Sequence, residues 1–270
     1  MKERISACIT AGNEEQNIRR CLESVTWCDE IVVVDSFSTD RTVDICREYT
    51  DLVYAHRWLG YIGQKNLIKD LASGEWILFI DADEEISPSL RDEILEEFRG
   101  DRQLGFAGYE FPRMVRYQNR WIRHGDWYPD VKLRLFRRDR GRCGGREPHD
   151  RILVEGAVRR LRNPMHHYTY TSIEDQVATM NKFSTITVAG QFEDGKRCRL
   201  IDLVLRPALR FLRGYLVKAG FLDGIPGLIV ATTAAFGVFV KYAKLWERYR
   251  SPDPIAVGPS QRTHPSTSGG

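Results

Sequence analysis

Short apolar runs alternate in the first hundred residues with segments whose apolar positions recur at helical spacing. Strands are predicted at residues 5–10, 30–35, 51–55 and 75–81. Helices are predicted at residues 14–25, 38–49, 63–73 and 87–99. Residues 31–34 are all isoleucine or valine, which is typical of a parallel strand buried on both faces. Strands and helices alternating in this way predict an α/β fold with a mostly parallel sheet flanked by helices.

The alternation ends after residue 105. Residues 107–125 predict a hairpin and residues 131–138 a strand, whereas the pattern is helical from Ser172 onward. Residues 251–270 are rich in Pro, Ser, Thr and Gly, a composition that favours disorder. We therefore expect a catalytic domain at 1–170, a helical extension at 171–250 and a disordered tail at 251–270.

Polar residues stand where three of the predicted strands end, namely Thr10, Asp35 and Asp81. Ligands of parallel sheets bind beyond these carboxyl ends, so the three side chains are expected to share one crevice. Asp81 and Asp83 form a D-x-D pattern that Glu84 extends. Carboxylates this close repel each other unless a cation or protons hold them. Mg²⁺ or Mn²⁺ would do so while binding diphosphate oxygens, which makes the diphosphate a better leaving group.

Several rival classes of protein fit the sequence less well. A P-loop nucleotidase needs G-x-x-x-x-G-K-[ST], but the nearest match, GQFEDGKR at 190–197, ends in arginine and comes after the acids. A dinucleotide-binding domain needs G-x-G-x-x-G, whereas the loop TAGNEE has one glycine. The six cysteines show no C-x-x-C spacing, which disfavours a zinc site. A net charge of +3 and the lack of an RNA-binding motif argue against a nucleic-acid partner.

Four motifs in order resemble the family 2 glycosyltransferases, which have the Rossmann-like GT-A fold. They are ITAGNEEQNI, EIVVVDSFSTDRT, GQKNLI and GEWILFIDADEEIS. Further along, LRLFRR, EPHD, HYTY and GFLDGIPGL resemble a bacterial subgroup that includes lipopolysaccharide core β-1,4-glucosyltransferases. The resemblance implies inverting transfer of a hexose from a nucleotide-sugar, UDP-linked in our expectation. The implied acceptor is a glycolipid or the lipopolysaccharide core.

The resemblance also implies roles for individual residues. The donor-binding candidates are Thr10, Asn13, Glu14, Asp35, Gln64, Lys65 and Asp81. Asp83 and Asp81 are the expected ligands of Mg²⁺ or Mn²⁺, and His167 is expected to complete that site. The acceptor hydroxyl needs a carboxylate base, for which Asp150 and Glu147 are the candidates.

Two other functions stay open from the sequence. A nucleotidyltransferase that makes nucleotide-sugars could use a similar sheet, although its first loop is typically Gly-rich and basic, unlike TAGNEEQN. A non-catalytic module that binds nucleotide-sugars is the other. Ten arginines between positions 113 and 146 are compatible with a phosphorylated acceptor or with a solvated face.

The C-terminal third predicts contact with a membrane. Residues 224–240 form an apolar run of 17 residues, shorter than the ~20 that a spanning helix needs. Residues 205–221 interleave apolar side chains with Arg and Lys, as in helices that lie in a membrane interface. The first residues lack the apolar region of a signal peptide. We therefore expect a cytoplasmic protein attached peripherally to the inner membrane, with a short spanning hairpin and a core helix pair as alternatives.

Overall fold

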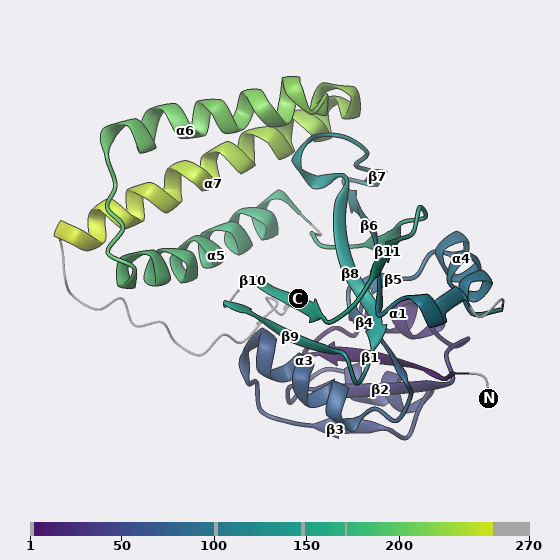
Figure 1. Ribbon diagram of the computed structural model, residues 1–270. Coiled ribbons are helices and arrows are strands. Elements are labelled where there is room, and N and C mark those ends of the chain that lie inside the picture. Colours follow the sequence, from purple (N-terminus) through teal and green to yellow (C-terminus); the bar gives the residue numbers. More distant parts are fainter. Residues whose placement is uncertain (1–2, 100–101, 147–148, 171, 251–270) are drawn as a thin grey trace, which may run out of the picture. The chain divides into compact units, whose positions relative to one another are not determined.

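The computed structural model describes residues 3–99, 102–146, 149–170 and 172–250. They form two compact units (Figure 1). Of the described residues, those up to Arg113 and those between Val131 and His167 form the first unit. Those between Met114 and Asp130 and those from Tyr168 onward form the second. The predicted tail at 251–270 lies outside the described residues.

The sheet and its flanking helices occupy the chain up to residue 167. In chain order the elements are β1 (Ile5–Ala11), α1 (Ile18–Ser24), β2 (Glu30–Asp35), α2 (Thr42–Arg47), β3 (Val53–Ala55), α3 (Gly60–Leu71), β4 (Trp76–Asp81), β5 (Glu84–Glu85), α4 (Pro88–Arg99), η1 (Arg102–Gly105), β6 (Gly108–Tyr117), β7 (Arg120–Trp121), η2 (Gly125–Trp127), β8 (Asp130–Arg137), β9 (Gly141–Arg146), β10 (His149–Val154), β11 (Val158–Arg160) and β12 (Met165–His167).

Most strands of the described chain join one sheet with the order β3-β2-β1-β4-β8-β6-β12-β5. β11 and β7 pair with β6, and β9 and β10 form a separate hairpin. The strands β3, β2, β1 and β4 run parallel to one another, and β8 joins β4 in the antiparallel sense. The α/β fold predicted from the alternation of strands and helices is therefore confirmed.

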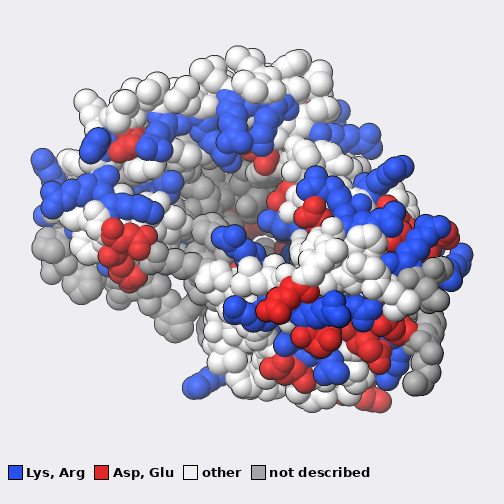
Figure 2. Space-filling model, in the orientation of Figure 1, with Lys and Arg blue, Asp and Glu red and all other residues white. Residues whose placement is uncertain are grey.

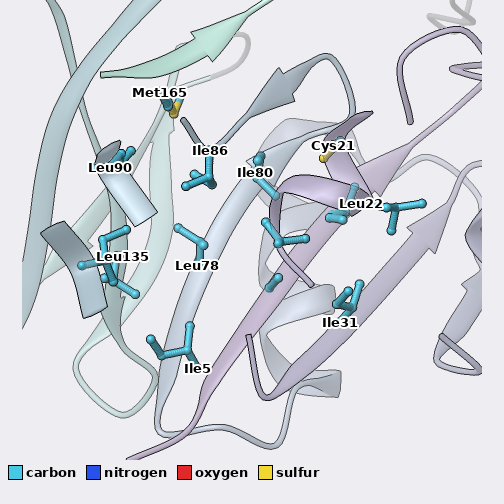
Figure 3. Close-up of a cluster of buried hydrophobic side chains, with 14 of the residues drawn as sticks. Ile5, Cys21, Leu22, Ile31, Leu78, Ile80, Ile86, Leu90, Leu135 and Met165 are labelled. Atoms are coloured by element: carbon cyan, nitrogen blue, oxygen red, sulfur yellow. The ribbon is translucent and has the colours of Figure 1, made fainter. Parts of the chain in front are cut away.

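Each central strand is buried on both faces because its alternate side chains enter two different cores. In β4, Trp76, Leu78 and Ile80 pack with helices α1, α2 and α4 in the larger core. Figure 3 shows Leu78 and Ile80 in this core, with Leu22 of α1 and Leu90 of α4. The intervening Ile77 and Phe79 pack on the opposite face with Ile68 of α3. The period of two along a strand thus explains why these runs are apolar without interruption.

The β9–β10 hairpin also lies against this second core, where Ile152 and Val154 are partly buried. The sequence pattern did not predict this hairpin. Its first strand, GRCGGR, contains three glycines and two arginines, so the alternation of apolar residues that marks a strand is missing.

Helices make up most of the second unit. They are α5 (Ile173–Glu193), α6 (Leu200–Leu212), the π-helical turn η3 (Arg213–Val217), η4 (Gly220–Asp223) and α7 (Gly224–Arg250). A small core of Val115, Tyr117, Ile122 and Val230 ties the strand segment of this unit to α7. Gln176 of α5 accepts a hydrogen bond from Tyr117 at 2.6 Å and donates one to Thr233 at 2.8 Å. The C-terminal helical extension is present as predicted.

Residues Gly220–Arg250 include a helix long and apolar enough to cross a membrane by length and composition alone. The mean hydropathy of its most apolar window is 1.6, and 28% of that window is buried within the protein.

The hairpin predicted at 107–125 is confirmed as β6 and β7, which pair through Arg116 and Trp121. The first helix begins at Ile18, later than expected. It follows a turn in which the Glu14 carbonyl accepts from the backbone N–H groups of Asn17 and Ile18.

Candidate active site

The register of the parallel strands brings the predicted strand-end residues to one edge of the sheet. Thr10 of β1 lies opposite Asp81 of β4, and its neighbour Ala11 lies opposite Asp35 of β2. Three polar side chains that are far apart in the sequence therefore stand on adjacent strands. This edge is where an α/β sheet binds its ligands.

The loops after β1 and β2 hold each other through polar contacts. Asp35 is buried, and its carboxylate accepts hydrogen bonds from the backbone N–H and the hydroxyl of Ser38. The Ser38 hydroxyl oxygen also accepts from the backbone N–H of Asn13 at 2.8 Å. The Asn13 side chain in turn accepts from the backbone of Thr39 at 2.8 Å. These contacts hold the two loops together.

Glu14 is also buried, and it contacts both its own turn and the second loop. Its backbone N–H donates to the Thr42 hydroxyl at 2.8 Å, and its carboxylate accepts from the Asn17 amide at 3.0 Å. In this structure Glu14 therefore joins the first loop to the start of α2.

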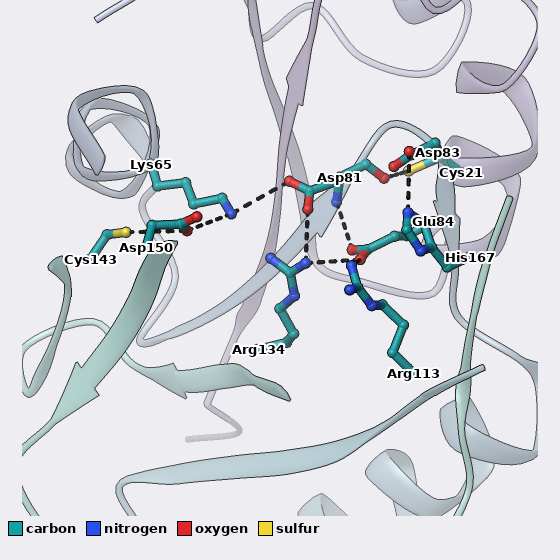
Figure 4. A network of polar contacts seen from close by, with 10 residues as sticks. All are labelled: Cys21, Lys65, Asp81, Asp83, Glu84, Arg113, Arg134, Cys143, Asp150 and His167. Carbon is teal, nitrogen blue, oxygen red and sulfur yellow. Dashed lines mark hydrogen bonds and ion pairs between the residues drawn. The ribbon is translucent and has the colours of Figure 1, made fainter. Parts of the chain in front are cut away.

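Helix α3 carries the two polar residues predicted near the donor, and both are buried. Gln64 donates to the Ser36 hydroxyl at 3.2 Å and accepts from the backbone N–H of Leu59. Lys65 lies 2.9 Å from Asp150 Oδ2 and 3.6 Å from Asp81 Oδ1 (Figure 4). Burial alone would lower the pKa of Lys65, but the two carboxylates outweigh it and raise that pKa.

Asp81 lies between two cations. Arg134 Nη2 donates to Oδ2 at 2.8 Å, while Lys65 approaches Oδ1. Burial is the largest influence on the pKa of Asp81 and would raise it. The attraction of the neighbouring cations, led by Lys65 and Arg134, exceeds that influence and holds the pKa well below its ordinary value. Asp81 is therefore a carboxylate at neutral pH.

Glu84 is the most deeply buried acid of this cluster, with its side chain 0% exposed. Its Oε1 accepts from Arg113 at 3.2 Å and from Arg134 at 2.8 Å. Its Oε2 accepts from the backbone N–H of Asp81 at 3.0 Å. Glu84 thus fixes the acidic turn and two guanidinium groups together (Figure 4).

Asp83 and His167 meet because β5 and β12 pair in the antiparallel sense, with His167 opposite Glu84. His167 Nε2 lies 3.2 Å from Asp83 Oδ2, and both side chains are nearly buried. Neighbouring ligand atoms of an octahedral cation with bonds of about 2.1 Å lie about 3 Å apart. The pair therefore fits two adjacent positions around Mg²⁺ or Mn²⁺.

Within the described ranges, no three His, Cys, Asp or Glu side chains are grouped so as to hold a metal ion. A cation at this pair would take its other ligands from water or from a bound diphosphate, as Mg²⁺ commonly does.

The candidate base Asp150 reaches this cluster through the β9–β10 hairpin. Asn66 of α3 exchanges two hydrogen bonds with the backbone of Cys143 in β9, at 2.9 and 3.0 Å. Asp150 on β10 lies opposite Gly145 of β9, and its Oδ2 accepts from Lys65. The other candidate base, Glu147, lies outside the described residues.

The sequence pattern did not reveal the structural importance of Arg134, Arg113 and Glu84. Arg134 is buried in β8 between Leu133 and Leu135, and a buried arginine inside an apolar strand needs a carboxylate partner. The motif LRLFRR contains such an arginine between two leucines, so the sequence could have indicated the role of Arg134. Other arginines of the basic segment have partners away from the cluster, such as Arg137, which pairs with Glu3 at 2.7 Å.

Comparison with known proteins gives a family and several similar proteins. The family model described as Glycosyl transferase family 2 matches residues 6–161. A curated relative, the lipopolysaccharide core biosynthesis glycosyltransferase LpsC of Rhizobium meliloti, is 34% identical over 91% of this chain and 93% of its own. An uncharacterized glycosyltransferase of Rickettsia felis is 31% identical over 91% of this chain and 90% of its own. The solved structure of residues 1–349 of TarS from S. aureus covers 92% of this chain and 91% of its own, with 16% identity and a TM-score of 0.43.

Proposed function

The chain belongs to glycosyl transferase family 2 and is a glycosyltransferase, and from this premise we propose which reaction it catalyses. The proposed reaction transfers a hexose from a UDP-linked sugar to a glycolipid or a lipopolysaccharide-core acceptor, with inversion at the anomeric carbon. The observation that carries the proposal is the position of Lys65, which joins the strand-end acid Asp81 to the candidate base Asp150. Membership of this family favours a transferase over the nucleotidyltransferase and the binding module.

The acceptor class is supported by the name of the Rhizobium relative, which belongs to lipopolysaccharide core biosynthesis. In our proposal the donor lies at the sheet edge. Its binding residues are Thr10, Asn13, Glu14, Asp35, Gln64, Lys65 and Asp81. The buried Asp35 and Gln64 are held by Ser38 and Ser36, so that they are fixed before the donor arrives.

Asp83 and His167 would hold Mg²⁺ or Mn²⁺. Asp81, the third residue expected at the metal, is paired with Lys65 and Arg134 and would have to leave these partners to join them. When bound, the cation neutralises the diphosphate and so stabilises the leaving nucleoside diphosphate. Arg134 keeps Asp81 ionised and oriented, because its guanidinium bridges Asp81 and Glu84. The acidic turn therefore has its shape before any cation or donor binds.

The chemical step uses one carboxylate of the chain. The acceptor hydroxyl oxygen forms a bond to the anomeric carbon while the bond from that carbon to the diphosphate oxygen breaks. The leaving nucleoside diphosphate takes the electron pair, and the proton of the hydroxyl passes to Asp150. Glu147 is the second candidate for this role. A single displacement of this kind inverts the anomeric centre.

We propose residues 1–170 as the catalytic domain and residues 171–250 as an extension that associates with the membrane. An acceptor anchored in lipid cannot leave the bilayer, so the enzyme has to come to it. The proposed location is the cytoplasm, peripheral to the inner membrane.

The test is sugar transfer and nucleotide release by the purified protein with a panel of UDP-, GDP- and dTDP-sugars. Each donor is assayed with Mg²⁺, Mn²⁺ or EDTA, beside the variants Asp83→Ala and Asp150→Asn. The control variant is Asp70→Asn, since that side chain is 71% exposed on α3. The proposal is supported if the wild type and Asp70→Asn release a nucleoside diphosphate in a metal-dependent way and Asp83→Ala and Asp150→Asn do not. Failure of every donor to bind contradicts it.

A further inference from the structure

Helix α6 turns its apolar side outward instead of burying it. The exposed apolar residues of this helix recur at helical spacing, so they share one side of it. They are Leu200 (77% exposed), Ile201 (56%), Val204 (65%), Leu205 (45%), Leu209 (53%) and Leu212 (45%). We call this set the α6 apolar face. A helix that packs in a protein interior would point such a stripe toward the core.

The α6 apolar face continues past the end of the helix. Val217 is 81% exposed, Leu222 is 58% exposed and Ile225 at the start of α7 is 75% exposed. Figure 2 shows this region as a light border along the top of the view, over α6. Single exposed apolar residues are ordinary, but a contiguous patch of this kind marks an interaction surface.

Basic residues border the α6 apolar face. Arg206, Arg210 and Arg213 follow one another at spacings of four and three along the adjacent side of the same helical stretch. In Figure 2 the Lys and Arg side chains of the helices gather just below the light border. This pairing of an apolar stripe with a cationic one is typical of helices that lie in a membrane interface.

A cavity of about 340 Å³ lies at the N-terminal end of the same face. It is lined by residues of α5, α6, α7 and the α5–α6 connection, including Lys196, Arg197, Arg199 and Arg206. Ile201 of the α6 apolar face is also part of its wall. The lining holds these four cations and one carboxylate, Asp202, which pairs with Arg206. The basic side chains of this wall suit an anionic group, and its apolar side chain suits a hydrocarbon chain beside that group.

Helix α7 makes polar contacts with α5 that favour a position outside the bilayer interior. Lys244 Nζ donates to the Asn181 side chain, Ser184 and Thr185, each at 2.7 Å. The Gln176–Thr233 contact would lie in the hydrocarbon region if α7 crossed it, where polar groups are costly.

We propose that the α6 apolar face docks on the surface of a lipid bilayer that contains anionic phospholipids. The apolar side chains enter the boundary between headgroups and acyl chains, and the basic border contacts lipid phosphates. A second copy of this chain fits the face less well, because pairing two such faces would bring two basic borders together. The choice of a membrane as the partner rests on the proposed function, and the α6 apolar face is the surface that makes the contact.

Co-sedimentation of the full chain with vesicles tests the inference. The vesicles are phosphatidylcholine alone or phosphatidylcholine mixed with phosphatidylglycerol. We expect the protein to prefer the anionic vesicles and added salt to weaken binding. Leu209→Glu and Val217→Glu should each lower the partition coefficient about tenfold or more. Arg213→Ala should lower it about fivefold on anionic vesicles only.

The matched control is Leu104→Glu, since Leu104 is 63% exposed but lies in η1 of the first unit. It should bind vesicles like the wild type. Donor binding without vesicles is measured for every variant and should not change, which separates this inference from the proposed function. Wild-type protein that binds donor but no vesicles overturns the inference, and so does equal vesicle binding by all variants. A dimer that Leu209→Glu dissociates, without vesicle binding, assigns the face to a second copy and also overturns it.

Discussion

Lys65 donates a hydrogen bond to Asp150 at 2.9 Å, although the two residues are 85 positions apart in the sequence. The same ammonium group lies 3.6 Å from Asp81. One buried cation thus contacts both the acid at the end of β4 and the candidate base on β10. Without it, two carboxylates would face each other in a poorly solvated site and repel.

Replacing Lys65 with methionine keeps the length of the side chain and removes its charge. We expect kcat/KM for sugar transfer to fall by about 100-fold or more, because Asp81 and Asp150 lose the cation that orients them. Lys69→Met is the control, since Lys69 lies one turn further along α3 and pairs with the exposed Asp70. Steady-state kinetics of both variants provide the comparison. Similar losses in the two variants would contradict the assigned role.

Glu84→Gln tests the buried acid that holds two arginines. Removal of its charge leaves Arg113 and Arg134 without their shared carboxylate, so we expect the free energy of unfolding to fall by about 3 kcal/mol. Urea denaturation measures the change. Glu85→Gln is the matched control, because that neighbouring side chain is 22% exposed and should cost much less. An unchanged denaturation midpoint in Glu84→Gln would show that the arginines are held by other groups.

Much of the first unit follows from local sequence pattern. The runs EIVVVD and WILFID have no polar alternation, which matches strands whose two faces enter separate cores. Parallel pairing then places Asp35 and Asp81 at one edge, since the carboxyl ends of parallel strands coincide. The strand-end acids could therefore be located from sequence alone.

The partners of those acids could not be located in this way. Lys65 meets Asp150 because the β9–β10 hairpin packs against α3, where Asn66 binds the backbone of Cys143. No periodicity in the sequence encodes that long-range contact. The amphipathic character of α6 was readable from its sequence, but the outward direction of its apolar face was not. Direction depends on which side packs against α7, which is a tertiary property.

The depressed pKa of Asp81 predicts a specific loss of stability in acid. A carboxyl whose pKa is lower in the folded state contributes stability above its unfolded pKa of about 3.9, and that contribution is lost as pH falls toward the folded value. The difference in unfolding free energy between wild type and Asp81→Asn should therefore be constant from about pH 5 to 7 and shrink below about pH 4. Denaturation at a series of pH values measures it. The exposed Asp70→Asn serves as control, and a difference that grows in acid would refute the sign.

His167→Ala should weaken metal activation, because His167 lies 3.2 Å from Asp83. We expect the Mn²⁺ concentration for half-maximal transfer to rise about 10- to 100-fold, with the maximal rate less affected. The neighbouring His166→Ala is a matched control, since His166 faces Glu85 at 3.5 Å instead. Metal titration of the two variants separates the roles. Equal shifts in both would indicate a general disturbance of β12.

Asn66→Ala tests whether the hairpin positions Asp150. The change removes both hydrogen bonds to Cys143 and so loosens β9 from α3, while the donor loops after β1 and β2 keep their contacts. We therefore expect kcat to fall about tenfold or more, because small displacements of a catalytic group are costly, with the dissociation constant of the donor nearly unchanged. Asn163→Ala is the control, since that amide binds Glu93 outside the cluster.

Both kcat and the dissociation constant of the donor are measured on the same preparations of each variant. A parallel loss of donor affinity in Asn66→Ala would mean that β9 supports the donor site as a whole. A fall in kcat alone would support Asp150 as the group that the hairpin carries to the acceptor.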